Sequence, residues 1–362
     1  MTASFSQFKS RYEKSKIKEF QNSLCTDPLV SVSIITYQHV SSIKQCIEGI
    51  LMQQTDFKFE ILLGEDDSTD GTREICIEYA KKFPKKIRLF LHSHDNNIFI
   101  DGRPTGKFNV LYNLFSARGK YIALCEGDDY WTDPLKLQKQ VDFLEANLDF
   151  AICFHNVFVE TKSGEKYIAN IIPKDKENET VFSITDLART NFIHTTSVLF
   201  RNGLIEEFPD WFFKSPAGDY PLHMLNARKG LIKYFNEPMA VYRSQIGIWS
   251  STSRQVQLTN LVKVLDLLIL EFKDDEMVTR NLTLQKYIHI NEILLIEFEN
   301  SRIEEFRKLL RQTVNENPEF AIYWTENGMN KIINDKNEAE KNLRLIRNST
   351  TYKTLKKIGI FK

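Results

Sequence analysis

The sequence lacks three features that would narrow its class at once: paired cysteines, a charge imbalance and a long apolar run. Its 362 residues contain five cysteines, an odd number without a Cys-x-x-Cys pair, which suits a reducing compartment. Lys plus Arg and Asp plus Glu each number 48, so bulk charge gives no support to a nucleic-acid partner. No apolar run approaches the roughly 18 residues of a membrane-spanning helix. The start "MTASFSQFKSRYEK" is too polar for a secretory signal. We therefore expect a soluble, cytoplasmic protein whose charge-driven chemistry is local.

The chain does have a regular alternation of two kinds of segment, and 42% of its residues are hydrophobic, enough to fill a sizeable core. Short runs rich in β-branched residues alternate with stretches of helical periodicity. The four runs are "LVSVSIITY", "FEILLGED", "IRLFLHS" and "YIALCEG", and three helical stretches separate them. This order predicts an α/β protein with an open, mostly parallel sheet flanked by helices.

Changes in composition and periodicity along the chain suggest three parts. Residues 1–27 form a polar N-terminal extension, residues 28–254 form the α/β domain, and residues 255–362 form a helical C-terminal region. The last of these ends in a basic tail, residues 341–362, with seven Lys or Arg and no Asp or Glu. Such a tail is either a solvated terminal helix or a segment that rests on an anionic membrane surface.

Acidic residues follow two of the predicted strands. The second strand ends in "GEDDSTDGT" and the fourth in "EGDD", about 60 residues later. Ligands of open parallel sheets bind beyond the carboxyl ends of the strands, so both groups should face one site. Carboxylates this close repel one another unless a cation or water lies among them. A metal site, a solvated turn and a helix cap therefore remain as interpretations.

Five motifs, in this order and spacing, make residues 29–250 resemble a known family. They are "VSIITY", "EDDSTDGTREI", Asn97, "ARGKYIALCEGDDYW" and "GDYPLHMLNARKGLIKYFNEPMAVYR". The resemblance is to the bacterial family 2 glycosyltransferases with the A-type glycosyltransferase fold. It implies inverting transfer of a hexosyl or N-acetylhexosaminyl group from a nucleotide-sugar, with Mn²⁺ or Mg²⁺. The Gln-x-x-Arg-Trp motif and membrane helices of the processive members are not visible, which favours the non-processive, cell-surface polysaccharide type.

Two departures from the family pattern stand out. The family usually has Asp-Asp-Gly-Ser where this chain has Glu65, Asp66, Asp67 and Ser68. It also usually has Asp-x-Asp where this chain has Glu126-Gly127-Asp128, and the extra methylene of the glutamate changes its reach.

The resemblance also implies roles for residues of the two acidic segments. Asp128 is the principal metal ligand, supported by Asp129 and Glu126, and Gly127 lets the donor approach the backbone. Asp66 accepts a hydrogen bond from the nucleotide base, most often from uracil N3–H. Thr36 and Tyr37 border that base, and Asn97 belongs to the same nucleotide-sugar site.

Further roles fall outside these segments. Asp219 matches the general base, and an N-cap is its structural alternative. Arg243 is placed where the family closes over the diphosphate, with a surface salt bridge as the alternative. Trp131 and Trp249 are candidates for sugar contact, with core packing as the alternative.

Two other functions compete with sugar transfer. A nucleotidyltransferase commonly carries a Gly-rich loop with Lys and Arg after its first strand, and "TYQHVSSIK" is not such a loop. The presence of both Asp128 and Asp219 argues against a non-catalytic nucleotide-sugar binding module or partner subunit. We therefore expect a nucleotide-sugar donor, a glycan or lipid-linked acceptor and no nucleic acid as partners. Peripheral contact with the inner face of the plasma membrane would go through the basic tail.

Overall fold

The structure is a computed structural model that describes residues 2–20, 27–244, 247 and 251–329, together with residues 331, 334, 337 and 341. Trp249 and residues 342–362 of the basic tail lie outside the described residues. The chain forms two compact units, Met1–Ser253 with Lys263–Leu282 and Arg254–Val262 with Thr283–Lys362. The two units therefore share helices α9 (Arg254–Glu271) and α10 (Glu276–Glu299).

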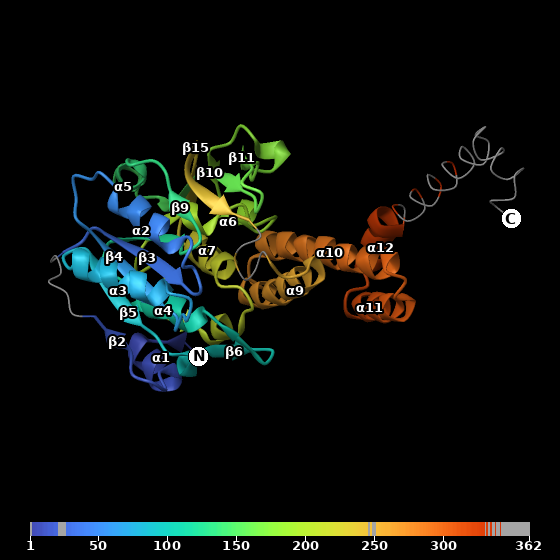
Figure 1. The fold of residues 1–362 in the computed structure, drawn as a ribbon. Helices are drawn as coiled ribbons and strands as arrows, with labels where there is room; N and C mark the ends of the chain where they lie inside the picture. Colours follow the sequence, from blue (N-terminus) through green and yellow to red (C-terminus); the bar gives the residue numbers. More distant parts are fainter. Residues whose placement is uncertain are drawn as a thin grey trace, which may run out of the picture. The chain divides into compact units, whose positions relative to one another are not determined.

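A mixed sheet is the centre of the first unit (Figure 1). Its order is β12-β15-β10-β13-β8-β3-β4-β5-β2, with β11 paired to β10 and β9 to β15. The bounds are β2 (Lys18–Glu19), β3 (Val30–Thr36), β4 (Phe59–Glu65), β5 (Ile87–Leu91), β8 (Tyr121–Glu126), β9 (Tyr130–Trp131), β10 (Phe150–Glu160), β11 (Lys166–Ile168), β12 (Val181–Phe182), β13 (Leu199–Arg201) and β15 (Leu231–Arg243). Strands β8, β3, β4 and β5 are parallel neighbours. The predicted α/β fold with a mostly parallel sheet is confirmed.

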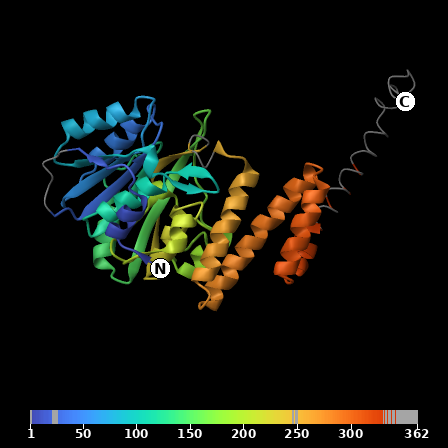
Figure 2. The ribbon, with the colours of Figure 1, turned by 90° about the horizontal axis from the view of Figure 1, so that it is seen from below.

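Helices cover both faces of this sheet, because successive side chains of a buried strand point to opposite sides. Ile61 and Leu63 of β4 join a core with α2 (Ile43–Leu51), α3 (Thr72–Lys82) and α5 (Lys136–Ala146). Leu62, between them, joins the opposite core with α4 (Lys107–Ser116) and α7 (Asp219–Ala227). Figure 2 shows strands between the two helical layers.

Residues 2–20 pack on the first unit. β1 (Thr2–Ala3) pairs with β14 (Phe208–Pro209), and β2 extends the sheet beside β5. Between them, α1 (Phe5–Tyr12) begins at Ser4, whose side chain and Gln7 form a capping box. Phe8 of this helix is fully buried and stacks on Phe108, 5.0 Å between ring centroids.

The remaining described elements are short or belong to the helical region. They are η1 (His94–Asn96), β6 (Ile98–Ile100), β7 (Arg103–Thr105), η2 (Lys174–Lys176), α6 (Ile184–Leu187), η3 (Thr195–Ser197), η4 (Asp210–Lys214), α11 (Ile303–Glu316), α12 (Phe320–Trp324) and η5 (Thr325–Met329). In the second unit, Leu294, Phe320 and Trp324 belong to a separate small core. Within the described part of the chain, no helix is both long and apolar enough to cross a membrane.

Candidate active site

The ends of three parallel strands meet at one edge of the sheet. Thr36, the last residue of β3, lies opposite Glu65, the last of β4, and Ile35 lies opposite Glu126, the last of β8. The apolar run of each strand stops here, and the chain turns away into a polar loop. The prediction that the two acidic segments share an edge is confirmed.

The loop after β8 holds the densest group of carboxylates. Oxygen atoms of Glu126, Asp128 and Asp129 all lie within 4.8 Å of one another. Asp128 is 5% exposed and Asp129 is 1% exposed, while Glu126 is half-buried. None of the three forms an ion pair with a Lys or Arg among the described residues.

Burial and mutual repulsion raise the pKa of two of these carboxyl groups. Loss of hydration, with repulsion from Asp128 and Asp219, raises the pKa of Glu126 to about 8. Burial, again with repulsion from Asp128, raises the pKa of Asp129 well above its usual range. Oδ2 of Asp129 is buried and accepts no hydrogen bond from the part of the chain described. Clustered carboxylate oxygens with a free buried acceptor fit a hard divalent cation.

Arg243 fixes the backbone of this acidic loop. Its N–H donates to Asp129 Oδ1 at 2.8 Å, and its Nη1 donates to the carbonyl of Asp128 at 2.6 Å. Its Nε pairs with Glu160 at 2.9 Å, and its guanidinium lies 4.5 Å from the centre of the Tyr130 ring. Gln45 also accepts from this guanidinium. Arg243 thus contacts the acidic loop and Glu160 in the structure, whereas the sequence predicted a contact with the diphosphate of the donor.

Gly127 is required by close packing within the chain. A Cβ atom at this position would lie 2.5 Å from Thr36 Oγ1 and 2.7 Å from His39 Nδ1. Those two side-chain atoms are themselves 3.1 Å apart. Burial lowers the pKa of His39, and the charges of Asp128 and Asp70 partly oppose this. His39, which sequence reasoning missed, therefore lies against the acidic loop.

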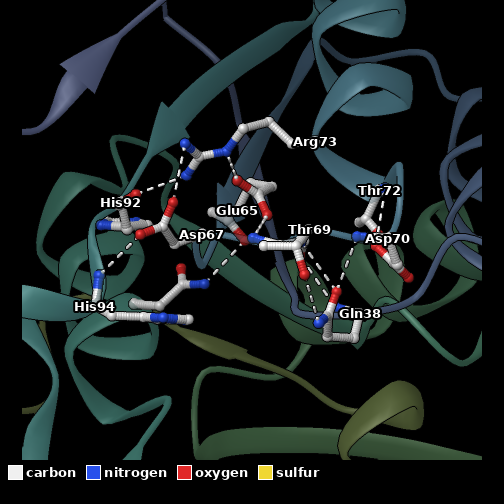
Figure 3. A network of polar contacts seen from close by, with 12 residues as sticks. Gln38, Glu65, Asp67, Thr69, Asp70, Thr72, Arg73, His92 and His94 are labelled. Atoms are coloured by element: carbon white, nitrogen blue, oxygen red, sulfur yellow. Dashed lines mark hydrogen bonds and ion pairs between the residues drawn. The ribbon is translucent and has the colours of Figure 1, made fainter.

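The loop after β4 is organised by ion pairs (Figure 3). Arg73 of α3 pairs with Glu65 and, at 3.2 Å, with Asp67, and its Nη2 donates to the His92 carbonyl at 2.7 Å. Asp66 lies between the two paired carboxylates in the sequence and is 6% exposed. Its Oδ1 is buried and has no hydrogen-bond partner among the described residues.

Burial dominates the protonation of Asp66. It raises the pKa of this carboxyl to about 6, with His94 opposing, Glu65 and Asp67 adding, and Arg73 opposing. The carboxyl is thus a buried acceptor that titrates just below neutrality.

Asp70, further along this loop, accepts hydrogen bonds at the start of helix α3. Asp70 Oδ1 accepts from Thr72 N at 3.0 Å and from Thr72 Oγ1 at 2.7 Å, at the start of α3. Gln38, after β3, bridges to the same turn through Thr69 and Asp70, as Figure 3 shows. Because Asp70 serves the helix, the cap explanation is not needed for Asp66 and Asp67.

Aromatic and amide side chains also lie in the loops at this edge of the sheet. The half-buried Tyr37 ring meets the exposed His94 ring edge-on, 5.2 Å between centroids. Asn97 ends η1, and its Oδ1 is buried without a hydrogen-bond partner in the described segments. Thr36 is 2% exposed. Tyr37, Asp66 and His94 thus come from the loops after β3, β4 and β5.

Asp219 is the first residue of α7, and Gly218 is the N-cap residue. The Asp219 charge acts on Glu126, which places it electrostatically beside the acidic loop. Lys107, which sequence reasoning also missed, supports the segment that precedes it. The Nζ atom of Lys107 donates to the carbonyls of Phe212 at 3.0 Å and Ala217 at 3.4 Å. Burial lowers the pKa of Lys107 to about 7, and Asp219 partly opposes this.

The prediction that Trp131 contacts sugar needs correction. Its side chain is 1% exposed, its Nε1 donates to the Thr196 carbonyl at 2.9 Å, and Lys136 Nζ lies 3.9 Å from its ring centre. The ring is therefore part of the core between α2 and α5 and is not offered to a ligand.

A solved structure shares this architecture. The mannosyltransferase PcManGT from Pyrobaculum calidifontis, in complex with GDP-Man and Mn²⁺, matches with a TM-score of 0.50 and 16% identity, covering 87% of this chain and 88% of that one. This likeness concerns the fold alone. The fold is that of the A-type glycosyltransferases.

Sequence comparison identifies the family of one segment. The sequence model of glycosyl transferase family 2 matches residues 31–208, just under half of the chain, and this segment is a domain of that family. An uncharacterized protein of Mycobacterium tuberculosis is 35% identical over 223 residues, 61% of each chain. The uncharacterized glycosyltransferase EpsJ of Bacillus subtilis is 27% identical over 224 residues, 60% of this chain and 61% of its own length. The matches thus span about three fifths of these relatives.

Proposed function

We propose that the domain is an inverting, non-processive glycosyltransferase that moves a hexosyl or N-acetylhexosaminyl group from a UDP-sugar to a hydroxyl of a glycan or lipid-linked acceptor. The observation that carries the proposal is the common edge of the sheet. It brings the buried carboxyl of Asp66 and the Glu126–Asp128–Asp129 cluster to neighbouring strand ends. The Asp66 carboxyl is suited to accept a hydrogen bond from a base N–H, and the Glu126–Asp128–Asp129 cluster is suited to hold a cation beside a diphosphate.

The donor lies across these loops in the proposal. Asp66 accepts a hydrogen bond from uracil N3–H, and cytosine, which lacks that proton, is rejected. Tyr37 and Thr36 border the base, and Asn97 presents its buried Oδ1 nearby. Guanine also offers a ring N–H to a carboxylate, so preference for GDP over UDP would contradict the choice of uracil.

Asp128, with Glu126 and Asp129, would hold Mn²⁺ or Mg²⁺. When bound, such an ion neutralises the charge that grows on the diphosphate as the sugar–phosphate bond breaks. Arg243 keeps the loop in place through Asp128 O and Asp129 Oδ1, and we assign it this role in donor binding.

Asp219 is the general base of the proposal. Its carboxylate takes the proton of the acceptor hydroxyl while that oxygen attacks the anomeric carbon from the face opposite the diphosphate. The bond from the anomeric carbon to the diphosphate oxygen breaks, and the nucleoside diphosphate leaves with the electron pair. The configuration at the anomeric carbon is thereby inverted.

The test is calorimetry with UDP in the presence and absence of Mn²⁺, followed by hydrolysis and transfer assays with a panel of nucleotide-sugars. Metal-dependent UDP binding and slow donor hydrolysis are expected. A wild-type protein that binds none of the nucleoside diphosphates would overturn the proposal, and binding without turnover would favour a binding module.

Synthesis of a cell-surface glycan on the inner face of the plasma membrane is the setting we propose, with the basic tail as peripheral contact. Its support is the seven basic residues within residues 341–362. Deletion of residues 341–362 should weaken binding to anionic liposomes at low salt and leave donor hydrolysis nearly unchanged. Full-length protein that ignores such liposomes would contradict the membrane contact.

A further inference from the structure

We propose that Arg73 is a positioning residue for the nucleotide base, and that it acts as one unit with Glu65 and Asp67. The inference rests on the proposed function, since it concerns how Asp66 is presented to the base. Glu65 and Asp67 are two positions where the chain departs from the family's Asp-Asp-Gly-Ser pattern. Both contact the same guanidinium in the structure.

The first step of the argument concerns Asp67. Its φ is 59°, in the left-handed region that suits glycine, the residue the family usually has here. An aspartate tolerates this conformation better than most residues, but at some cost. Two contacts hold it there: the ion pair with Arg73 at 3.2 Å, and the His94 N–H donating to its Oδ2 at 3.3 Å.

The second step concerns Glu65. Its side chain is fully buried, so its charge needs a partner. Its Oε1 accepts from Ser68 N at 2.7 Å and its Oε2 faces Arg73 Nε. The extra methylene of a glutamate, compared with the family's aspartate, gives this carboxylate the length to contact both the loop and α3. Arg73 is thus the ion-pair partner of both residues that depart from the family pattern, Glu65 and Asp67.

The third step concerns the residue between them. Asp66 is held on both sides by the paired carboxylates, and its N–H donates to the Thr36 carbonyl at 3.0 Å. Its Oδ1 stays buried without a partner in the described residues, as a recognition group should. Arg73 also binds the His92 carbonyl, so it joins the loop after β4 to the loop that presents His94 beside Tyr37 (Figure 3). Arg73 therefore ties the loop that carries Asp66 to the loop that carries His94.

The test compares two altered proteins with a matched control. Arg73→Lys keeps the charge but carries its donors on one nitrogen, so it loses the planar fork that contacts Glu65, Asp67 and the His92 carbonyl together. Glu65→Gln combined with Arg73→Met removes the buried Glu65 charge together with its partner. Arg88→Lys is the control, because Arg88 also has one carboxylate partner, Glu19, and one carbonyl partner, Ser116, and lies on β5 away from the site edge. Affinities for UDP, CDP and Mn²⁺ are measured by calorimetry, with circular dichroism and thermal melting on each preparation.

We expect UDP affinity to fall by about tenfold in both altered proteins, because a hydrogen bond to a charged group is lost or misplaced. CDP affinity should change little, so the ratio of UDP to CDP affinity falls toward one. Mn²⁺ affinity and all values for Arg88→Lys should stay near wild type. A purely structural Arg73 would lower the melting temperature and leave the UDP-to-CDP ratio unchanged, which would overturn the inference.

Two further outcomes are informative. If Arg73→Lys does not fold, the double variant alone decides, through the same ratio. If the wild-type protein binds neither UDP nor CDP, the proposed function fails and this inference falls with it; wild-type UDP selectivity that survives in the folded variants overturns the inference alone.

Discussion

The loops after β4 and β8 each leave the same edge of the sheet with a cluster of three acidic residues, Glu65–Asp67 in the first and Glu126, Asp128 and Asp129 in the second, yet they balance charge in opposite ways. After β4, Glu65 and Asp67 share the guanidinium of Arg73. After β8, oxygen atoms of the three carboxyl groups lie within 4.8 Å of one another, and the guanidinium of Arg243, which donates to the Asp128 carbonyl, pairs with Glu160 instead. Arg243 gives the acidic loop hydrogen bonds to its backbone and to Asp129, but no ion pair.

The difference separates two kinds of preorganisation. A loop whose charges are already paired holds its shape without a ligand, which suits recognition of a neutral base. A loop with crowded, unpaired carboxyl groups gains most when a cation arrives, which suits a diphosphate site. The comparison therefore predicts that substitutions in the two loops affect different ligands.

The largest expected effect lies beside the acidic loop, at Asp219. An amide in Asp219→Asn cannot take the acceptor proton, so kcat should fall by roughly 100-fold or more, equivalent to about 2.7 kcal/mol. Folding and metal-dependent UDP affinity should stay near wild type, because Gly218, and not Asp219, is the N-cap residue of α7. The measurement is transfer to an identified acceptor beside UDP calorimetry.

Two results would contradict this assignment. Near wild-type transfer would mean that the base lies elsewhere, with Glu126 and Asp129 as the next candidates. Loss of UDP binding as well would place Asp219 in the donor site.

The next effect tests the metal half of the comparison. Asp128→Asn should reduce Mn²⁺ affinity by roughly 100-fold and remove the Mn²⁺ enhancement of UDP binding, because the main carboxylate ligand is lost. Asp67→Asn in the other loop is the matched control, and it should keep the enhancement even where its UDP affinity is lower. If both variants lose the enhancement, the division between the loops is wrong.

A smaller effect is expected at Arg243, which supports the acidic loop without pairing with it. Arg243→Met removes donors to Asp128 O and Glu160 from a side chain that is 13% exposed. We expect Mn²⁺ affinity to fall by about tenfold and the free energy of unfolding by about 1–3 kcal/mol. Calorimetry and chemical denaturation give the two values.

The control for Arg243 is Lys166→Met, which removes another cation from Glu160, 3.2 Å away, and a donor to Tyr130 Oη at 2.9 Å, but no hydrogen bond to Asp128 or Asp129. It should leave Mn²⁺ affinity unchanged. Equal losses in both variants would show that the effect comes from the shared partners Glu160 and Tyr130, and not from the hydrogen bond to Asp128.

Periodicity and strand order predict the parts of this molecule that depend on local pattern. The four parallel strands read as apolar runs because both of their faces are buried, and the acidic segments share an edge because parallel strands end together. Asp128 and Asp66 could be named because their neighbours in the sequence form motifs.

Side-chain partners depend on tertiary contacts that no local pattern encodes. Trp131 follows the acidic loop in sequence, yet its ring turns into the core, where Thr196 and Lys136 meet it. Arg243 reaches Asp128 from 115 positions away. Arg73 carried one signal that was available beforehand: an aspartate where the family has glycine calls for a compensating cation nearby.

The smallest expected effect is a pH dependence of base binding, and we expect it to come from the carboxyl group of Asp66 in the loop after β4. Burial raises the pKa of Asp66 to about 6, and the charged carboxylate is a stronger acceptor for uracil N3–H than the protonated carboxyl group. Affinity should therefore be near its maximum at about pH 7 and fall as the pH drops through 6, by up to roughly tenfold between pH 7 and 5. Uridine is the ligand of choice, followed by NMR titration, because it has no phosphate to titrate. Glu65, Asp67, Arg73 and His94 also face this carboxyl, so His94→Gln is run beside Asp66→Asn to separate the imidazole from the carboxylate. A profile that stays steep in Asp66→Asn and flattens in His94→Gln would move the titrating group to the loop after β5, and would leave the carboxylate of Asp66 without its role in reading the base.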